Sequence, residues 1–235
     1  MVAVIGDIHG CYFTLKNLVE KIIVKYPDIP IYCVGDLVDR GNYCFEVIEY
    51  IKSKNIQCVI GNHDYMFYSN MRDPFSIMAK SWNYNGSETT LISYKDKLNQ
   101  MDEHLDFIIS LPLFYNLNDC FISHAGIAKS IKSKLPENIL DDDAKLNKIL
   151  SDDLFNQNSI IWTRSDLLNI GKLQVVGHTH RKEVYFDKDS NAIFIDTTAF
   201  GNNMLSAAII DQSCLVEIIY EKTCIDDVNK NWIRF

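Results

Sequence analysis

Residues 2–10 read Val-Ala-Val-Ile-Gly-Asp-Ile-His-Gly, an apolar run that leads directly into two potential metal ligands. Val2 to Ile5 has the length and composition of a buried strand. Asp7 and His9 lie two positions apart, so in extended backbone they point to the same face and can reach one cation. Carboxylate and imidazole ligands together favour Mn, Fe or Zn over Ca. Taken alone, the segment is equally consistent with a turn aspartate and a solvent-exposed histidine.

Four further segments place polar residues of metal-binding type after strand-like runs, and the five segments together contain five of the six histidines. Side chains that converge from several strand ends are how a two-metal hydrolase is built. A single histidine is more often structural than a ligand, but packing alone does not explain five at such positions. The segments are Gly6–Gly10, Gly35–Gly41, Gly61–Asp64, His124–Gly126 and Gly177–His180.

The second and third segments supply candidates for acid–base chemistry. Asp36 can bridge two metals, whereas Asp39 is better placed to orient a neighbouring acid or base. Arg40 offers a planar pair of donors for a phosphate, although a surface Asp–Arg pair in a tight turn is the common alternative. Asn62 can act as a neutral oxygen ligand or as the N-cap of the next helix. His63, held by Asp39, can donate a proton to a leaving group.

The remaining candidates lie in the second half of the chain. His124 and His178 are further imidazole ligands, and His180, two positions beyond His178, can reach the other metal. Arg164, in Trp162-Thr163-Arg164, is a second phosphate-binding candidate, or else a surface arginine on an aromatic platform. The segment Trp82–Gly86, with Thr90, either lines the cleft or forms a helix interrupted by glycine.

Composition limits the classes of protein to consider. A chain of 235 residues with 47% hydrophobic residues suits one domain, 1–235, with a large core. No apolar run approaches a membrane span or a signal peptide, so we expect a cytoplasmic protein and favour a monomer. The formal charge of −8 argues against nucleic-acid binding. Seven scattered cysteines indicate reduced thiols rather than a disulfide framework.

The order of the expected elements indicates an α/β fold. Residues 1–60 alternate strand, helix, strand, helix, strand, and residues 63–112 are mostly helical. The second half is richer in strands, which suggests mixed sheets and a hairpin across Asp187–Asn191. Residues 136–158 carry six acids, which we interpret as a solvated helical excursion or, alternatively, as a lid. These acids are Glu137, Asp141, Asp142, Asp143, Asp152 and Asp153.

The combined motifs resemble the calcineurin-like metallophosphoesterases, and more narrowly the phosphoprotein phosphatases of the bacterial and phage lambda branch. Bis(5'-nucleosyl)-tetraphosphatases are close relatives of that branch. The resemblance implies a four-layer α/β/β/α sandwich with mixed sheets. It also implies roles for individual residues: a first metal on Asp7, His9 and Asp36, a second metal shared by Asp36 and completed by Asn62, His124 and His178, the acid pair His63 and Asp39, and phosphate binding by Arg40 and Arg164.

Three positions depart from the pattern of the resembled family. His180 stands where the phosphoprotein phosphatases have proline, and it matches the Gly-His-x-His of broader metallophosphoesterases, whose last histidine joins the first metal. Asp64 replaces a longer glutamate. Thr198 stands where glycine is frequent, which argues against a positive φ there.

We therefore expect a phosphatase in which a hydroxide held between two divalent metals attacks phosphorus in line. The metals would be Mn, with Fe or Zn as alternatives. The main expectation for the substrate is phosphoserine or phosphothreonine in proteins, with phosphotyrosine as an extension. The alternative is a bis(5'-nucleosyl)-tetraphosphatase or another nucleotide polyphosphate hydrolase. A remote alternative is an inactive module that binds phosphorylated partners.

Overall fold

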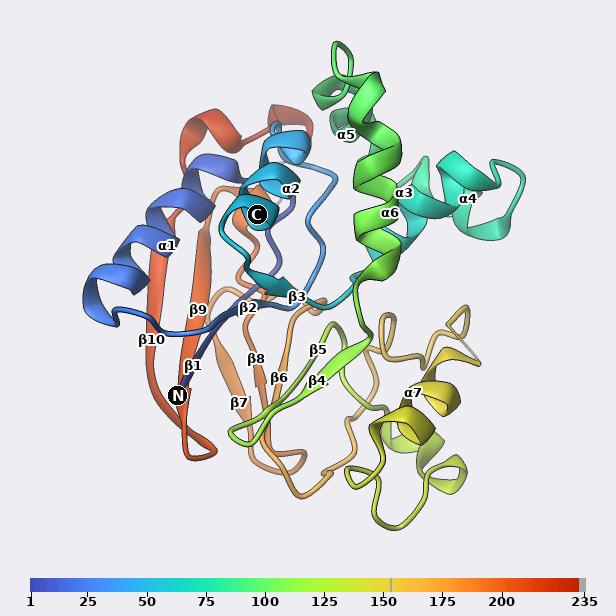
Figure 1. The fold of residues 1–235 in the computed structure, drawn as a ribbon, viewed down its shortest axis with the longest axis vertical. Coiled ribbons are helices and arrows are strands. Elements are labelled where there is room, and N and C mark those ends of the chain that lie inside the picture. Colours follow the sequence, from blue (N-terminus) through green and yellow to red (C-terminus); the bar gives the residue numbers. More distant parts are fainter. Residues whose placement is uncertain (153, 233–235) are drawn as a thin grey trace.

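The computed structural model describes residues 1–152 and 154–232, which build two five-stranded sheets packed against each other (Figure 1). The first sheet has the order β10-β9-β1-β2-β3, and the second has the order β4-β5-β6-β8-β7. With helices outside both sheets, this is the predicted four-layer α/β sandwich.

The first 60 residues follow the predicted alternation of strands and helices. Strands β1, β2 and β3 are parallel, so their carboxyl ends share one edge of the sheet. The elements are β1 (Val2–Ile5), α1 (Tyr12–Lys25), β2 (Ile31–Cys33), α2 (Cys44–Ser53) and β3 (Gln57–Cys58). The sheet is completed by two antiparallel strands from the end of the chain, β9 (Met204–Asp211) and β10 (Cys214–Lys222).

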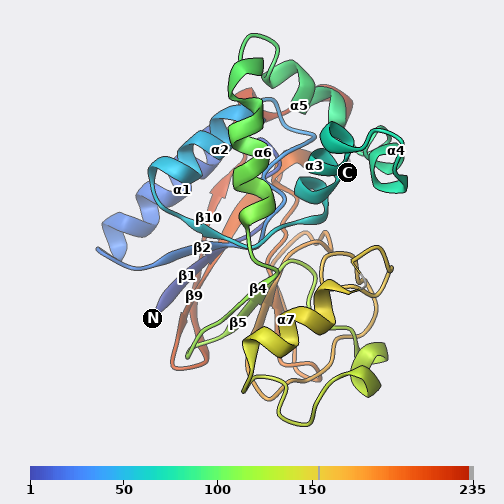
Figure 2. The same ribbon diagram turned by 45° about the vertical axis from the view of Figure 1, so that its right-hand side comes forward.

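Residues 62–110 are helical, as predicted, and lie beside the first sheet (Figures 1 and 2). Gly86 separates two of the helices with φ of +99°, so the predicted glycine break is real. The helices are α3 (Asn62–Arg72), α4 (Ile77–Trp82), α5 (Ser87–Ser93) and α6 (Met101–Ser110).

The second sheet is mixed and contains the predicted hairpin. The antiparallel pair of β7 (Tyr185–Asp187) and β8 (Ala192–Phe194) turns across residues 188–191. Strand β7, whose side chains Tyr185 and Phe186 are exposed, is the first arm of that hairpin. The other strands are β4 (Phe114–Asn116), β5 (Phe121–Ser123) and β6 (Gln174–Val176).

Alternate side chains of β1 pack into two different hydrophobic cores. Val2 and Val4 join the cluster between the two sheets, whereas Ala3 and Ile5 join the cluster under the helices. This period of two is what a strand buried on both faces requires. The first sheet therefore forms an inner layer, and its strand ends are held rigidly between two cores.

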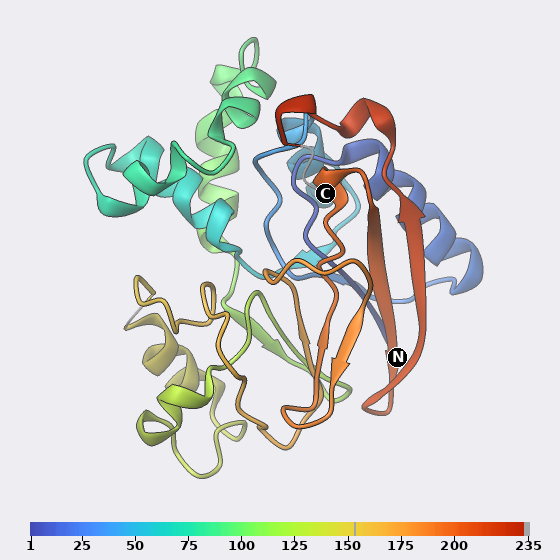
Figure 3. The same cartoon turned by 180° about the vertical axis from the view of Figure 1, so that it is seen from behind.

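The described parts of the acidic segment, residues 136–152 and 154–158, lie beside the second sheet, as Figure 3 shows from behind. Its helix α7 (Asp143–Ser151) begins at Asp142, whose carboxylate accepts a hydrogen bond from the Lys145 N–H at 2.9 Å. Leu146 and Leu150 are buried, so one side of α7 is packed. Asp153, one of the six acidic residues of this segment, lies outside the described residues. A lid function for this segment stays a prediction.

Two expectations from composition can be compared with the described residues. All seven cysteines are unpaired, as predicted from their odd number and scattered positions. Among residues 1–152 and 154–232, no helix has the length and apolar character to cross a membrane.

Candidate active site

Six of the seven candidate metal ligands lie at the carboxyl ends of neighbouring strands and are all buried. Asp36 belongs to two convergent groups of ligand atoms, in which all atoms lie within 4.8 Å of one another. One group joins it to Asp7 and His124, and the other to His9 and His63. The six residues are Asp7 and His9 after β1, Asp36 after β2, Asn62 after β3, His124 after β5 and His178 after β6.

The ring nitrogens of the histidines are fixed by backbone carbonyl groups. Each of three imidazoles donates one N–H to a carbonyl, which leaves its other nitrogen directed into the cluster as an electron-pair donor. The bonds run from His9 Nδ1 to Val38 O (2.8 Å), from His124 Nδ1 to Val34 O (2.7 Å) and from His178 Nε2 to Trp162 O (3.0 Å). This orientation of a neutral ring is what a metal ligand needs.

The amide oxygen of Asn62 completes one side of the cluster. It lies 2.9 Å from Nε2 of His124 and 2.8 Å from Nδ1 of His178. Asp7 is positioned by the backbone N–H of His178, which donates to its Oδ2 at 3.0 Å. The ends of four strands far apart in the sequence are therefore joined at this one point.

Burial sets the protonation of these groups. It raises the pKa of Asp36 to about 7 and raises that of Asp7 well above its ordinary value, with Asp196 and Asp36 adding charge repulsion. Burial also lowers the pKa of His124 to about 4, so that ring is neutral at pH 7. Crowded carboxylates with neutral imidazoles form a donor set that divalent cations stabilise. The residues present therefore fit a metal centre.

The predicted acid pair is formed, and two further side chains hold it. His63 Nδ1 lies 2.6 Å from Asp39 Oδ2. The same carboxylate accepts hydrogen bonds from the indole N–H of Trp82 at 2.9 Å and from the hydroxyl of Thr90 at 2.6 Å. Trp82 and Thr90, which the sequence suggested as cleft residues, are instead buried behind Asp39.

The two predicted phosphate-binding arginines differ in their environment. Arg40 is buried, with Nη1 2.8 Å from Nε2 of His9 and Nη2 2.8 Å from Nε2 of His63. Its guanidinium also lies 4.5 Å from the centroid of the Phe200 ring. Arg164 is exposed, and its charge reaches the cluster: the pKa of His178 is lowered by burial, by His124 and by Arg164.

His180 lies at the edge of the site. Its Nε2 is 3.2 Å from Nη1 of Arg40 and 3.4 Å from Oδ2 of Asp196. Within the described part of the chain it belongs to neither convergent group, so its binding of a metal stays a prediction. Asp196 was missed by the sequence analysis. It is buried shortly after β8, and its Oδ2 accepts no hydrogen bond from the described residues. Its position near a strand end was the signal that could have identified it.

Two smaller predictions are corrected by local geometry. Asn62 is not an N-cap, because α3 begins at Asn62 and Gly61 is the capping residue. Asp64 accepts the N–H groups of Gly61 at 3.0 Å and Leu37 at 2.8 Å, which ties α3 to the loop after β2. Thr198 does adopt a positive φ of 58°, although its side chain disfavours that conformation.

The family model for calcineurin-like phosphoesterases matches residues 1–182. The chain belongs to this family. Curated relatives include an asymmetrical bis(5'-nucleosyl)-tetraphosphatase of Halalkalibacterium halodurans, 32% identical over 143 residues, which are 53% of this chain and 56% of the relative. Another is a symmetrical bis(5'-nucleosyl)-tetraphosphatase of Ectopseudomonas mendocina, 29% identical over 73% of this chain and 63% of the relative. The chain thus matches less than two thirds of the length of either relative.

The names of solved structures with the same fold include both diadenosine tetraphosphatase and protein phosphatase. One is the cold-active protein-tyrosine phosphatase of a psychrophilic Shewanella species, with a TM-score of 0.60 and 20% identity over 95% of this chain and 80% of that one. At this identity the likeness concerns the fold alone. The curated relatives described above are named bis(5'-nucleosyl)-tetraphosphatases, whereas this solved structure is named a protein-tyrosine phosphatase.

Proposed function

We propose that the chain is a two-metal hydrolase of dinucleoside polyphosphates. The observation that carries this proposal is the intact donor set at the strand ends, in a chain whose curated relatives are named bis(5'-nucleosyl)-tetraphosphatases. Asp7, His9 and Asp36 would hold one divalent cation, and Asp36, Asn62, His124 and His178 the other. We propose Mn, because mixed oxygen and imidazole donors suit it, with Fe or Zn as alternatives. Bound cations would lower the pKa of a water and offset phosphate charge.

The other residues of the site bind phosphate and move a proton. Asp39 holds Nδ1 of His63, while Nε2 lies 2.8 Å from Nη2 of Arg40. Once Arg40 turns to a substrate phosphate, Nε2 would be able to carry the proton that the departing oxygen takes up. Arg40 and Arg164 supply guanidinium groups that match phosphate oxygens in shape and charge. These two arginines lie in a chain with a formal charge of −8. The attraction of an anionic substrate must therefore act at short range.

A phosphoprotein phosphatase remains the second candidate. The specific observation in its favour is Trp162-Thr163-Arg164, which resembles the Trp-x-Arg of the phage branch, with Arg164 exposed where a protein substrate can reach it. The two substrates differ in leaving group, since a polyphosphate releases a nucleotide phosphate, whereas a phosphoserine releases an alkoxide.

Parallel assays decide between these substrates. The Mn-loaded protein is given diadenosine tetraphosphate and a phosphoserine peptide, and kcat/KM is measured for both. We expect at least a tenfold preference for the dinucleotide, which corresponds to about 1.4 kcal/mol in the transition state. Asp36→Asn should remove both activities, which excludes a contaminating enzyme. A preference for the phosphopeptide would reject the proposed substrate in favour of the second candidate.

A further inference from the structure

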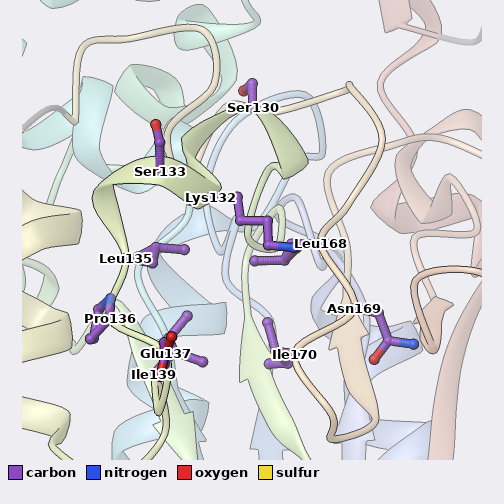
Figure 4. A pocket seen from close by; sticks show the side chains of 10 residues that line it. All are labelled: Ser130, Lys132, Ser133, Leu135, Pro136, Glu137, Ile139, Leu168, Asn169 and Ile170. Carbon is purple, nitrogen blue, oxygen red and sulfur yellow. The ribbon is translucent and has the colours of Figure 1, made fainter.

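One hollow on the described residues has a volume of about 720 Å³, and its lining contains none of the candidate site residues. Figure 4 shows Leu135, Leu168 and Ile170 among its lining side chains. Residues 168–170 precede β6, whose opposite end leads to His178. No feature of this hollow indicates a particular ligand.

A second cavity, of about 260 Å³, shares Arg164 with the candidate active site. Its wall contains Arg164, which follows the Trp162 carbonyl that fixes the ring of His178. The opposite wall contains Thr179 and Arg181, the two chain neighbours of His180. Both walls are thus direct continuations of segments that build the metal cluster. Arg164 links the two places, because it lines this cavity and its charge also acts on His178.

Arg181 is preorganised for anion binding in this cavity. Its Cζ lies 4.4 Å from the ring centroid of Tyr185 and 4.7 Å from that of Phe194, so two aromatic rings hold the guanidinium. Its Nε is buried and has no hydrogen-bond partner among the described residues. A stacked guanidinium loses little freedom when it binds a phosphate through its terminal nitrogens.

Carboxylates in the same cavity weaken the binding of a single phosphate there. Asp187 is already occupied by the hydroxyl of Ser190 at 2.5 Å and the N–H of Asp189 at 3.3 Å. Asp166 is exposed and opposes an anion. A single phosphate in the cavity would therefore bind weakly. A phosphate attached to one held at the metal cluster binds with the advantage of a high effective concentration.

We propose that this cavity is a subsite for the phosphate groups next to the one under attack, with Arg181 as its specific residue and Arg164 shared with the metal cluster. The proposal rests on the proposed function only in assuming a substrate with several linked phosphates. The ligand class is a linear polyphosphate chain, whether inorganic or part of a nucleotide.

Titration calorimetry with inorganic tripolyphosphate and with orthophosphate tests the subsite without requiring turnover. Wild-type protein, loaded with Mn at fixed free metal, should bind tripolyphosphate more tightly than orthophosphate. Arg181→Gln should weaken tripolyphosphate binding about tenfold, as expected for loss of a charge-assisted hydrogen bond. Orthophosphate binding should change by less than about twofold. Asp166→Asn should tighten tripolyphosphate binding roughly two- to fivefold, because it removes an exposed like charge.

Lys182→Gln is the matched control, since it removes one positive charge from the exposed neighbour of Arg181. It should leave both affinities within about twofold. Equal affinities of the wild type for the two anions would overturn the subsite, and so would an Arg181→Gln variant that binds tripolyphosphate normally. If the wild type binds tripolyphosphate through Arg181 but does not hydrolyse diadenosine tetraphosphate, the proposed substrate is rejected. The subsite proposal then still holds.

Discussion

The carboxylate of Asp39 is surrounded by three donors at once, and this fixes how the acid pair is positioned. His63, Trp82 and Thr90 all lie within 3.0 Å of its oxygens, and all are buried. Hydrogen bonds to a charged group contribute about 1.5–3 kcal/mol each, so two buried neutral donors can hold the carboxylate in one orientation. Trp82 and Thr90 are therefore positioning residues that act through Asp39.

Removal of either donor should therefore impair the proton transfer from His63. We expect Trp82→Phe and Thr90→Val to lower kcat about tenfold on a substrate with a poor leaving group, such as an alkyl phosphate. The same variants should change kcat little on p-nitrophenyl phosphate, whose leaving group needs less protonation. His63→Asn should show the same selectivity on a larger scale, roughly 10²–10⁴-fold on the poor leaving group.

Thr90→Ser is the conservative control for these variants, because it keeps the hydroxyl group and should retain activity. A uniform loss on both substrates would show that Trp82 and Thr90 support the fold rather than the acid pair. Normal turnover of the alkyl phosphate by Thr90→Val and Trp82→Phe would remove any role for these donors.

The role of a residue could be predicted only where its partner lies close to it in the sequence. Asp7 and His9 are neighbours on one strand end, so their shared direction follows from sequence spacing. Trp82 and Thr90 reach Asp39 across 43 and 51 positions, and no local pattern encodes such contacts. The orientation of each imidazole could not be predicted either, because it depends on backbone carbonyls such as Val34 O.

At the scale of elements, the turns that follow the strands contain residues with unusual backbone conformations. Five residues of the candidate site have left-handed backbone although none is glycine: His9 (φ 46°), Asp36 (52°), Asp39 (73°), Arg40 (71°) and His178 (64°). Each such residue costs on the order of 1–3 kcal/mol, and concentration of this strain in one place is typical of functional sites. Bonds between the loops help to offset it, for example from His9 N to Asp36 O at 2.8 Å.

Close approach of the backbone to the ligands makes one glycine sensitive to substitution. A Cβ atom at Gly177 would lie 1.9 Å from Oδ1 of Asp7 and 2.6 Å from Cγ2 of Val34. We expect Gly177→Ala to displace Asp7 and weaken Mn binding by the order of 10–100-fold, as loss of a group that orients a ligand does. Calorimetric Mn titration measures this, with circular dichroism to verify the fold.

Gly171→Asn is the control for this substitution. A Cβ at Gly171 meets nothing within 4 Å, and asparagine tolerates its φ of +77°. It should bind Mn as the wild type does. Unchanged Mn affinity in Gly177→Ala would mean that Asp7 is not held by this approach.

The elements themselves were predictable where their periodicity was strong. Residues 1–60 combine short apolar runs with helical spacing, and the structure follows that pattern closely. Strand β7 lies at the edge of its sheet with Tyr185 and Phe186 exposed, and only the predicted hairpin across Asp187–Asn191 implied it. Pairing with β8, and not its own composition, makes it a strand.

At the scale of the whole molecule, the sandwich follows from the family resemblance, but the strand order does not follow from spacing. Strand β1 lies between β2, its near neighbour in sequence, and β9, some 200 residues later. Such long-range pairing is chosen by burial of both faces of β1, which local propensity cannot report. The same pairing brings the last third of the chain, with Asp196, to the site formed by the first third.

The crowding of acids at this junction couples metal binding, stability and pH. Burial raises the pKa of Asp36 to about 7, whereas an unfolded carboxyl ionises near 4. Without a cation, the folded protein therefore holds more protons than the unfolded chain between about pH 4 and 7, and these carboxyls destabilise it as pH rises. A cation binds the ionised carboxylates, so below pH 7 it must displace a proton. His124, with its pKa lowered to about 4, adds no competing proton in this range.

The stabilisation by Mn should therefore grow as pH rises from 5.5 to 7.5, by about 1.4 kcal/mol per pH unit for each proton displaced. Thermal unfolding at fixed free Mn, compared with EDTA at each pH, measures this difference. Asp36→Asn should lose most of the Mn stabilisation and its pH dependence together, because one residue is shared by both convergent ligand groups. Mn stabilisation that is constant with pH, or greatest at pH 5.5, would contradict a cation site built on these buried carboxylates.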